Sequence, residues 1–129
     1  MRIIALIARL LLGLIFLVFG LNGFLSFLHM PPLTGLALQY LTVMSQSGIM
    51  NVVFLLQVLC AVLLLAGWFV PLALTLIAPV IVNIFLFHAT MAPSGLPLAF
   101  IVVILWIILF WRYRASFAPL FANTRSNHG

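Results

Sequence analysis

Few residues of this chain have side chains that could bind a ligand or take part in a reaction, and several of them fall in one stretch. The sequence VNIFLFHATMAP, residues 82–93, places Asn83, His88 and Met91 among apolar side chains. An amide donates and accepts hydrogen bonds without titrating, whereas imidazole and thioether together suit copper or the axial positions of haem. Five residues correspond to about 500° of helical turn, so Asn83 and His88 should point about 140° apart. We therefore treat them as two separate candidate sites.

The first candidate site is a level of amides formed by Asn22, Gln57 and Asn83. At 1.5 Å per residue, each amide lies roughly 10 Å below the outer end of its predicted helix. An amide that faces lipid is costly, so we expect all three to point into a helix bundle. Two interpretations stay open: a hydrogen-bonded lock between helices, or the floor of a polar pocket that opens outward. Such a pocket suits a carbonyl or hydroxyl, as in a quinone head group.

The second candidate site is a set of metal ligands, His29, His88 and Met91, expected near the outer surface. These residue types suit copper or haem. No spacing motif links them, however. Methionine is also a common apolar filler, and a histidine at the end of a helix is often only an interfacial residue.

Composition sets the class of protein. Of the 129 residues, 67% are hydrophobic and 4% are charged. A soluble domain of this length exposes most of its residues and cannot hide so much apolar surface, so the sequence predicts an integral membrane protein.

The residues that are missing exclude several kinds of chemistry. The chain has no Asp or Glu, which excludes paired-carboxylate hydrolysis, calcium-binding loops and a carboxylate proton relay. Its single cysteine, Cys60, excludes an intramolecular disulfide and a C-x-x-C pair. We predict no catalytic residue and expect no catalytic activity from the chain on its own.

Four apolar runs predict an all-α integral membrane fold, a bundle of four transmembrane helices. The segment PPLTGLALQYLTVMSQSG, between the first two runs, places Leu36, Tyr40 and Val43 at helical spacing. It predicts a short amphipathic helix in the first outer loop, lying across the end of the bundle. We expect one domain over residues 1–121 and a flexible cytoplasmic tail over residues 122–129. The spans are predicted at about 3–28, 49–67, 71–90 and 98–111.

The orientation follows from the arginines, which flank the first and last spans and are absent from the loops. The positive-inside rule places both termini in the cytoplasm, and the same arginines attract anionic lipid head groups. No basic patch with interleaved aromatic residues is present, so nucleic acid is excluded as a partner. The arginines are Arg2, Arg9, Arg112, Arg114 and Arg125. Interfacial anchoring is predicted for Trp68, Trp106 and Trp111.

Small residues predict how the helices pack, because close packing rather than the hydrophobic effect associates helices in lipid. Gly13, Gly20 and Gly23 fall near one face of the first span. Cys60 and Gly67, seven residues apart, share a face of the second. Both sets are predicted to let neighbouring backbones approach closely.

Several stretches resemble the DoxX family of small four-helix bacterial membrane proteins. They are IARLLLGLIFLVFGLNGF, FLLQVLCAVLLLAGWFVPLALTLIAPVIVNIFLFH, APSGLP and ILFWRYRASFAPLF, and FGLNGF and FVPLALTLIAPVIVNIFLFH are the most specific. The resemblance runs from about Arg2 to Phe121. It departs at Gln57, where many relatives carry glutamate, and near Gly23, where some carry lysine. The chain therefore has no counterpart of a buried ion pair.

The resemblance implies a location and a function. It implies a multi-pass protein of the bacterial cytoplasmic membrane that serves as an accessory subunit of a quinone-linked redox system, with quinone as its cofactor. The alternatives are a structural or assembly partner in a larger membrane complex, and a copper or haem protein of the outer face. Besides the lipid bilayer, we expect a protein partner or a homo-oligomer.

Overall fold

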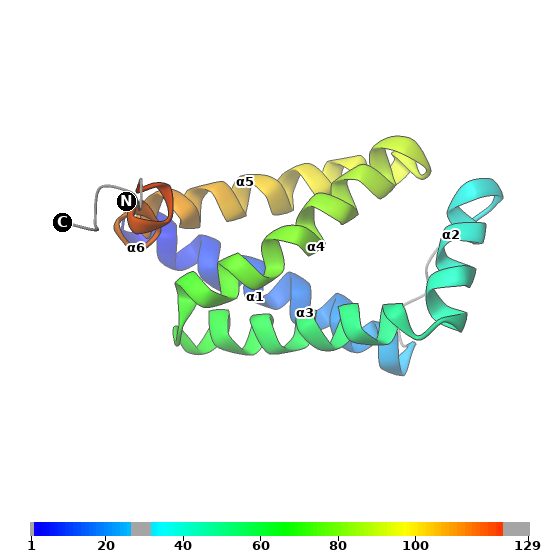
Figure 1. Ribbon diagram of the computed structural model, residues 1–129, viewed down its shortest axis with the longest axis horizontal. Coiled ribbons are helices and arrows are strands. Elements are labelled where there is room, and N and C mark those ends of the chain that lie inside the picture. The colour runs from blue at the N-terminus through cyan, green and yellow to red at the C-terminus, as the bar shows by residue number, and fades with distance from the viewer. Residues whose placement is uncertain (1, 27–31, 123–129) are drawn as a thin grey trace.

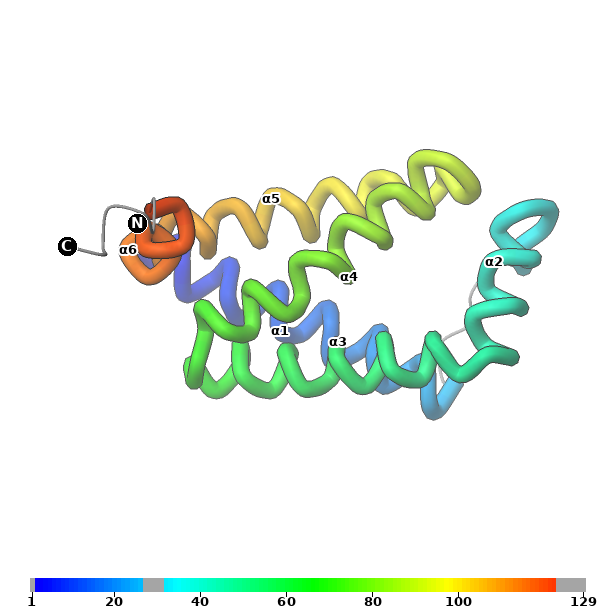
Figure 2. The backbone as a smooth tube through the Cα atoms, in the orientation of Figure 1, coloured from blue at the N-terminus to red at the C-terminus, as the bar shows by residue number. Residues whose placement is uncertain are grey.

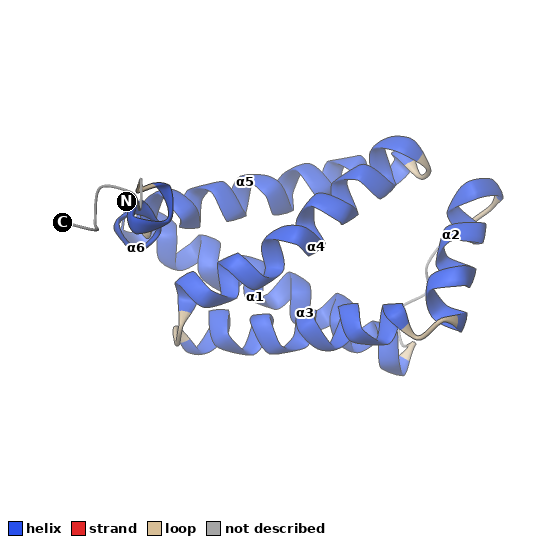
Figure 3. Ribbon diagram, in the orientation of Figure 1, coloured by secondary structure: helices blue, strands red, loops and turns tan. Residues whose placement is uncertain are grey.

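The computed structural model describes residues 2–26 and 32–122, and over these ranges it contains helices and no strand (Figure 3). The helices are α1 (Arg2–Leu25), α2 (Gly35–Gln46), α3 (Ile49–Ala66), α4 (Val70–Thr90), η1 (Pro93–Gly95), α5 (Leu96–Arg112), α6 (Arg114–Phe117) and η2 (Ala118–Phe121).

Four of these helical segments are long and apolar enough to cross a membrane, which confirms the predicted fold class. They are α1, α3, α4 and the segment Pro93–Arg112, which joins η1 to α5. The start of α1, the α3–α4 turn and α6 lie together at one end of the bundle (Figure 1). Helix α2 and the α4–α5 turn lie at the other end. We call these the arginine end, for Arg2, Arg9, Arg112 and Arg114, and the cap end, for α2.

Helices α1 and α3 pack against each other extensively, and glycine makes their close approach possible. A Cβ atom added at Gly13 would lie 2.9 Å from the Leu65 side chain, and one at Gly20 would lie 2.9 Å from Val58. A Cβ at Gly23 would overlap the ring of Phe54. The predicted packing role of these three glycines is therefore confirmed.

The centre of the bundle is a core of aliphatic side chains with no exposed surface. Leu12 of α1, Leu64 of α3, Leu74 and Ile77 of α4, and Leu109 of α5 all have 0% exposure. Each long helix therefore contributes to one shared core. The opposite faces of the same helices present leucine, isoleucine and phenylalanine outward, as lipid contact requires.

Helix α2 confirms the predicted short helix in the loop, and it runs crosswise to the bundle at the cap end (Figure 2). Its buried side differs from the apolar stripe that the sequence indicates. Leu36 and Val43 are 65% and 63% exposed, whereas Ala37 is 2% exposed and Tyr40 is half-buried. Apolar spacing identifies a stripe, but in a membrane that stripe can face lipid instead of the protein.

The chain beyond α5 forms two short helices that the sequence did not lead us to expect. Phe117 of α6 is 5% exposed, and its ring packs 4.9 Å from that of Phe110. This contact folds the segment back onto the end of α5. The predicted flexible tail, apart from Ala122, lies outside the described residues, as does the candidate ligand His29.

Candidate functional site

Two of the three predicted amides lie on the closely packed helix pair. Gln57 of α3 is 5% exposed, and a Cβ added at Gly20 of α1 would lie 3.2 Å from its Cβ. Asn22, two residues further along α1, is half-buried. No buried side-chain nitrogen or oxygen among residues 2–26 and 32–122 lacks a hydrogen-bond partner. Gln57 is therefore buried against α1, as the expectation of an inward-pointing amide required.

The third amide, Asn83, belongs to a different contact. Its side-chain N–H donates to the hydroxyl of Tyr40 on α2 over 2.8 Å, and the Asn83 side chain is exposed. The ring of Tyr40 packs 5.2 Å from that of Phe87, one turn further along α4. The expectation that all three amides point into the bundle is correct for Gln57 and wrong for Asn83. The cap helix bonds this amide from outside the bundle, and the sequence does not indicate that pairing.

His88 lies apart from this contact, as the helical angle predicted. Its Nδ1 lies 3.3 Å from the carbonyl oxygen of Ala92, which can accept a hydrogen bond from a protonated Nδ1. A Cβ atom at Gly95 would overlap the imidazole ring. The histidine is thus packed into the α4–α5 turn, while Asn83 faces the cap helix.

Of the proposed metal ligands, the structure describes His88 and Met91. Met91 ends α4, three residues after His88, and it is half-buried. Within the described ranges, no group of three His, Cys, Asp or Glu side chains is close enough to hold a metal ion. The pairing of His88 with His29 is outside what the structure describes.

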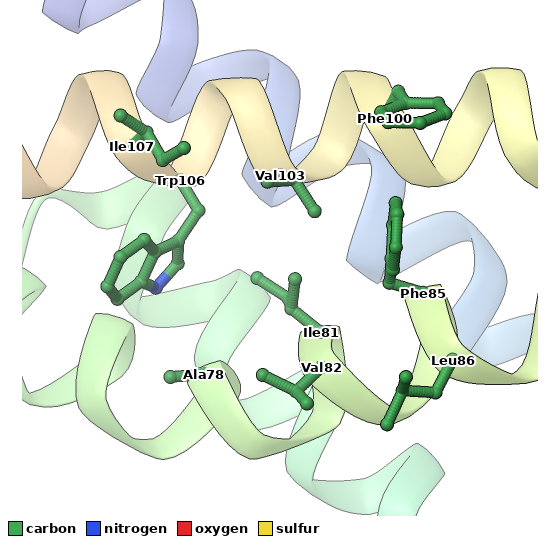
Figure 4. A pocket seen from close by; sticks show the side chains of 9 residues that line it. All are labelled: Ala78, Ile81, Val82, Phe85, Leu86, Phe100, Val103, Trp106 and Ile107. Carbon is green, nitrogen blue, oxygen red and sulfur yellow. The ribbon is translucent and has the colours of Figure 1, made fainter. Parts of the chain in front are cut away.

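A groove of about 440 Å³ runs between α4 and α5 (Figure 4), and the sequence did not predict it. The rings of Phe85 and Phe100 meet edge to face across it, with centroids 5.1 Å apart. The only side-chain polar atom among its lining residues is the indole nitrogen of Trp106, which donates to the carbonyl of Leu74 over 3.0 Å. The groove therefore accepts an apolar chain and offers no donor to a polar head group. Its lining residues are Ala78, Ile81, Val82, Phe85, Leu86, Phe100, Val103, Trp106 and Ile107.

Trp106 also corrects a prediction, since it joins α5 to α4 within the bundle instead of anchoring the chain at the membrane surface. It is half-buried, and its ring stacks 5.3 Å from that of Phe110. Trp68 and Trp111 are 66% and 58% exposed and keep the exposure that interfacial anchors need.

The groove and the Asn83–Tyr40 pair lie on different flanks of α4. Val82 lines the groove beside α5, and successive residues of a helix are about 100° apart. Asn83 is turned instead toward α2, where it meets Tyr40. The lining of the groove includes neither Asn83 nor Tyr40.

At the arginine end, Arg9 makes a long-range contact within the bundle. From the sequence we assign this residue only a role in membrane topology. Its Nη1 donates to the carbonyl of Leu64 over 2.7 Å and approaches that of Leu65 at 3.4 Å. These carbonyls belong to the last turn of α3, where the regular bonds of an α-helix run out, and that of Leu64 also accepts from the N–H of Gly67 over 3.3 Å. A guanidinium placed there also complements the negative end of the helix dipole. Arg9 therefore caps α3.

Gly67 has a role other than the predicted packing face shared with Cys60. It ends α3 in the left-handed region, with φ of 74°, and the N–H of Trp68 then bonds the carbonyl of Leu63 at 3.0 Å. This is the Schellman arrangement that glycine favours. A Cβ at Gly67 would lie 2.7 Å from Nη1 of Arg9, so the missing side chain also makes room for the cap.

Protein-family models, curated proteins and solved structures give no match to this chain. The resemblance to the DoxX family therefore rests on the sequence stretches quoted above.

Proposed function

We propose that the chain is a DoxX-like accessory subunit of a quinone-linked redox system in the bacterial cytoplasmic membrane, without catalytic activity of its own. In this proposal a quinone head group binds at Asn83 and Tyr40. The observation that carries it is the hydrogen bond between these residues, made by an exposed amide within a membrane-spanning helix.

An exposed amide at this position calls for a polar occupant. Asn83 lies seven residues before the end of α4, roughly 10 Å along the helix from the cap end. A polar group facing hydrocarbon at such a depth is costly, and the bond to Tyr40 uses only part of its hydrogen-bonding capacity. A ligand carbonyl placed there would relieve this cost.

The pair has the donors that a quinone carbonyl needs. After the bond to Tyr40, Asn83 keeps a second amide N–H, and the Tyr40 hydroxyl keeps its own hydrogen. The ring of Phe87, packed 5.2 Å from that of Tyr40, supplies an aromatic surface beside them. A quinone ring is planar and carries two carbonyl acceptors, so it suits this combination of donors and aromatic surface.

The positions of the arginines support the orientation in this proposal. The described arginines belong to the first turns of α1, the end of α5 and the start of α6, which lie at the end of the bundle opposite α2. With the arginine end in the cytoplasm, both termini are cytoplasmic and the Asn83–Tyr40 pair lies in the outer half of the membrane.

Binding of a short-chain ubiquinone to the purified chain in lipid nanodiscs tests the proposal. We expect saturable binding that weakens about fivefold in Asn83→Leu and in Tyr40→Phe, the effect of losing one hydrogen bond. Thr75→Val is the matched control, because Thr75 is an exposed polar residue of α4 whose hydroxyl bonds only to Pro71 of its own helix. Absence of saturable binding by the wild type, or equal binding by Asn83→Leu, would overturn the proposal.

The exposed side of α2 supports a second candidate function, a structural partner in a larger membrane complex. Leu36 and Val43, seven residues apart on this helix, are both largely exposed. Affinity purification in mild detergent should recover a stoichiometric partner that is lost in Leu36→Ser and Val43→Ser. Leu120→Ser is the control, since Leu120 is 70% exposed at the opposite end. A chain that purifies without any partner contradicts this function.

A further inference from the structure

The arginine end contains a second cavity, of about 320 Å³, between the first turns of α1 and the end of α5. Three arginines line it: Arg2 and Arg9 from α1, and Arg112 from α5. The rest of its lining is formed by Ile3, Ala5, Leu6 and Tyr113. Two helices that are far apart in sequence thus bring guanidinium groups to one hollow.

This concentration of positive charge has no acidic side chain to balance it. The chain contains no Asp or Glu, so no side-chain carboxylate of its own can pair with the three guanidinium groups. Like charges that share a cavity repel each other, and burial of the half-buried Arg9 removes part of the water that would screen them. An anion from outside the chain would stabilise the arrangement.

The three arginines are held in different ways. Arg9 is fixed by the carbonyls of Leu64 and Leu65, which engage one of its terminal nitrogens and leave the other free to donate. Arg112 lies over the ring of Tyr113 at 6.0 Å. Arg2 begins α1 and is exposed. One fixed cation with two exposed cations around it can surround an anion from several sides.

We propose that this cavity binds a phosphate group through Arg2, Arg9 and Arg112. The guanidinium fork matches the tetrahedral oxygens of phosphate and can bond two of them at once. The first turn of α1 adds backbone N–H groups that have no helical partner and the positive end of the helix dipole. The site is independent of the quinone proposal, because it lies at the other end of the bundle.

The apolar part of the lining favours the head group of an anionic phospholipid as the source of this phosphate. Ile3 and Leu6 are 72% and 46% exposed, so an acyl chain leaving the cavity would meet apolar side chains. Free phosphate has the same head-group chemistry but makes no use of these side chains. The two sources therefore differ in a property that an experiment can separate.

The lipid source is tested with the full chain in nanodiscs made of phosphatidylcholine with or without phosphatidylglycerol. Native mass spectrometry then counts the lipids retained after the nanodisc is removed. We expect saturable retention of phosphatidylglycerol that weakens about tenfold in Arg112→Gln and in Arg2→Gln, the effect of one charge-assisted hydrogen bond. The free source is tested by titrating inorganic phosphate into the delipidated chain in detergent and recording the phosphorus NMR shift.

Arg114→Gln is the matched control, because it removes the same charge at the same end. Arg114 does not line the cavity; it bonds the carbonyl of Trp111 at 2.8 Å and lies over its ring at 4.6 Å. We expect a change smaller than twofold in this variant. Arg9→Gln is avoided because it would also remove the cap of α3.

The possible results distinguish a lipid phosphate, a free phosphate and the absence of a phosphate site. Retention of phosphatidylglycerol with the expected order of variants supports a lipid phosphate. Saturable binding of inorganic phosphate alone, with the same order, supports the phosphate site with a free source. The proposal is overturned if neither probe binds saturably, or if Arg114→Gln weakens binding as much as Arg112→Gln, because that result indicates general surface charge. If Arg112→Gln does not fold, the comparison of Arg2→Gln with Arg114→Gln provides the same test.

Discussion

The contact between Arg9 and the end of α3 predicts that Gly67→Ala is destabilising for two separable reasons. Alanine at this position must adopt a φ of 74°, in the left-handed region. Its Cβ would also lie 2.7 Å from Nη1 of Arg9, and that nitrogen can move away only by giving up its hydrogen bond to Leu64. The substitution therefore acts through the backbone and through the cap at the same time.

The two contributions can be estimated. A left-handed conformation costs a non-glycine residue about 1 kcal/mol. A hydrogen bond to a charged group contributes about 1.5 kcal/mol at the low end of its range. Gly67→Ala should therefore lower the free energy of unfolding by about 2.5 kcal/mol.

A double-mutant cycle separates these contributions. Arg9→Met keeps a long side chain at residue 9 but removes the donors, so it should cost about 1.5 kcal/mol by itself. In that background Gly67→Ala has no cap left to break and should cost only about 1 kcal/mol. The double variant should then be about 1.5 kcal/mol more stable than the sum of the single changes predicts. Reversible unfolding in mixed micelles with increasing dodecyl sulfate, followed by circular dichroism, measures all four stabilities.

Additive effects of the two substitutions would refute this reasoning, because they would mean that the glycine and the arginine act independently. Gly67→Ala with a cost near 1 kcal/mol in the wild-type background would refute it as well, since only the backbone contribution would then be present.

Three further predictions use the same preparation. Gly23→Ala should destabilise the chain by about 1–3 kcal/mol, because its Cβ would overlap the ring of Phe54; unchanged stability would contradict the close approach of α1 and α3. Trp106→Phe should cost about 1 kcal/mol through loss of the bond to the Leu74 carbonyl, and an unfolding midpoint equal to that of the wild type would exclude that bond. Cys60 has 0% exposure, so a membrane-permeant maleimide should label it only after unfolding; rapid labelling of the folded chain would show that the core opens readily.

The sequence predicted the elements well because apolar length is a local property. The second span was expected over about residues 49–67 and α3 covers Ile49–Ala66; the third was expected over about residues 71–90 and α4 covers Val70–Thr90. The glycines of the first span were predictable for a related reason, since their shared face follows from helical periodicity alone.

Pairings between elements were less predictable, because they depend on how the elements are placed in space. The partner of Asn83 is Tyr40, which lies 43 residues away on a helix whose buried side the apolar pattern did not identify. Arg9 joins residues that lie 55 and 56 positions further along the chain. In a soluble protein the apolar stripe of a helix indicates its buried side. In a membrane the same stripe can face lipid, so the apolar pattern does not predict which side of α2 contacts the bundle.

The cap formed by Arg9 has a consequence for the order in which the chain assembles. Arg9 lies in α1, which is synthesised before α3, whereas Leu64 lies in the last turn of α3. The bond closes only after α3 has entered the membrane and its far end has returned to the side where α1 began. Until that moment the guanidinium must stay hydrated at the membrane surface. The guanidinium of Arg9 thus becomes part of the folded bundle only once α1 and α3 have paired.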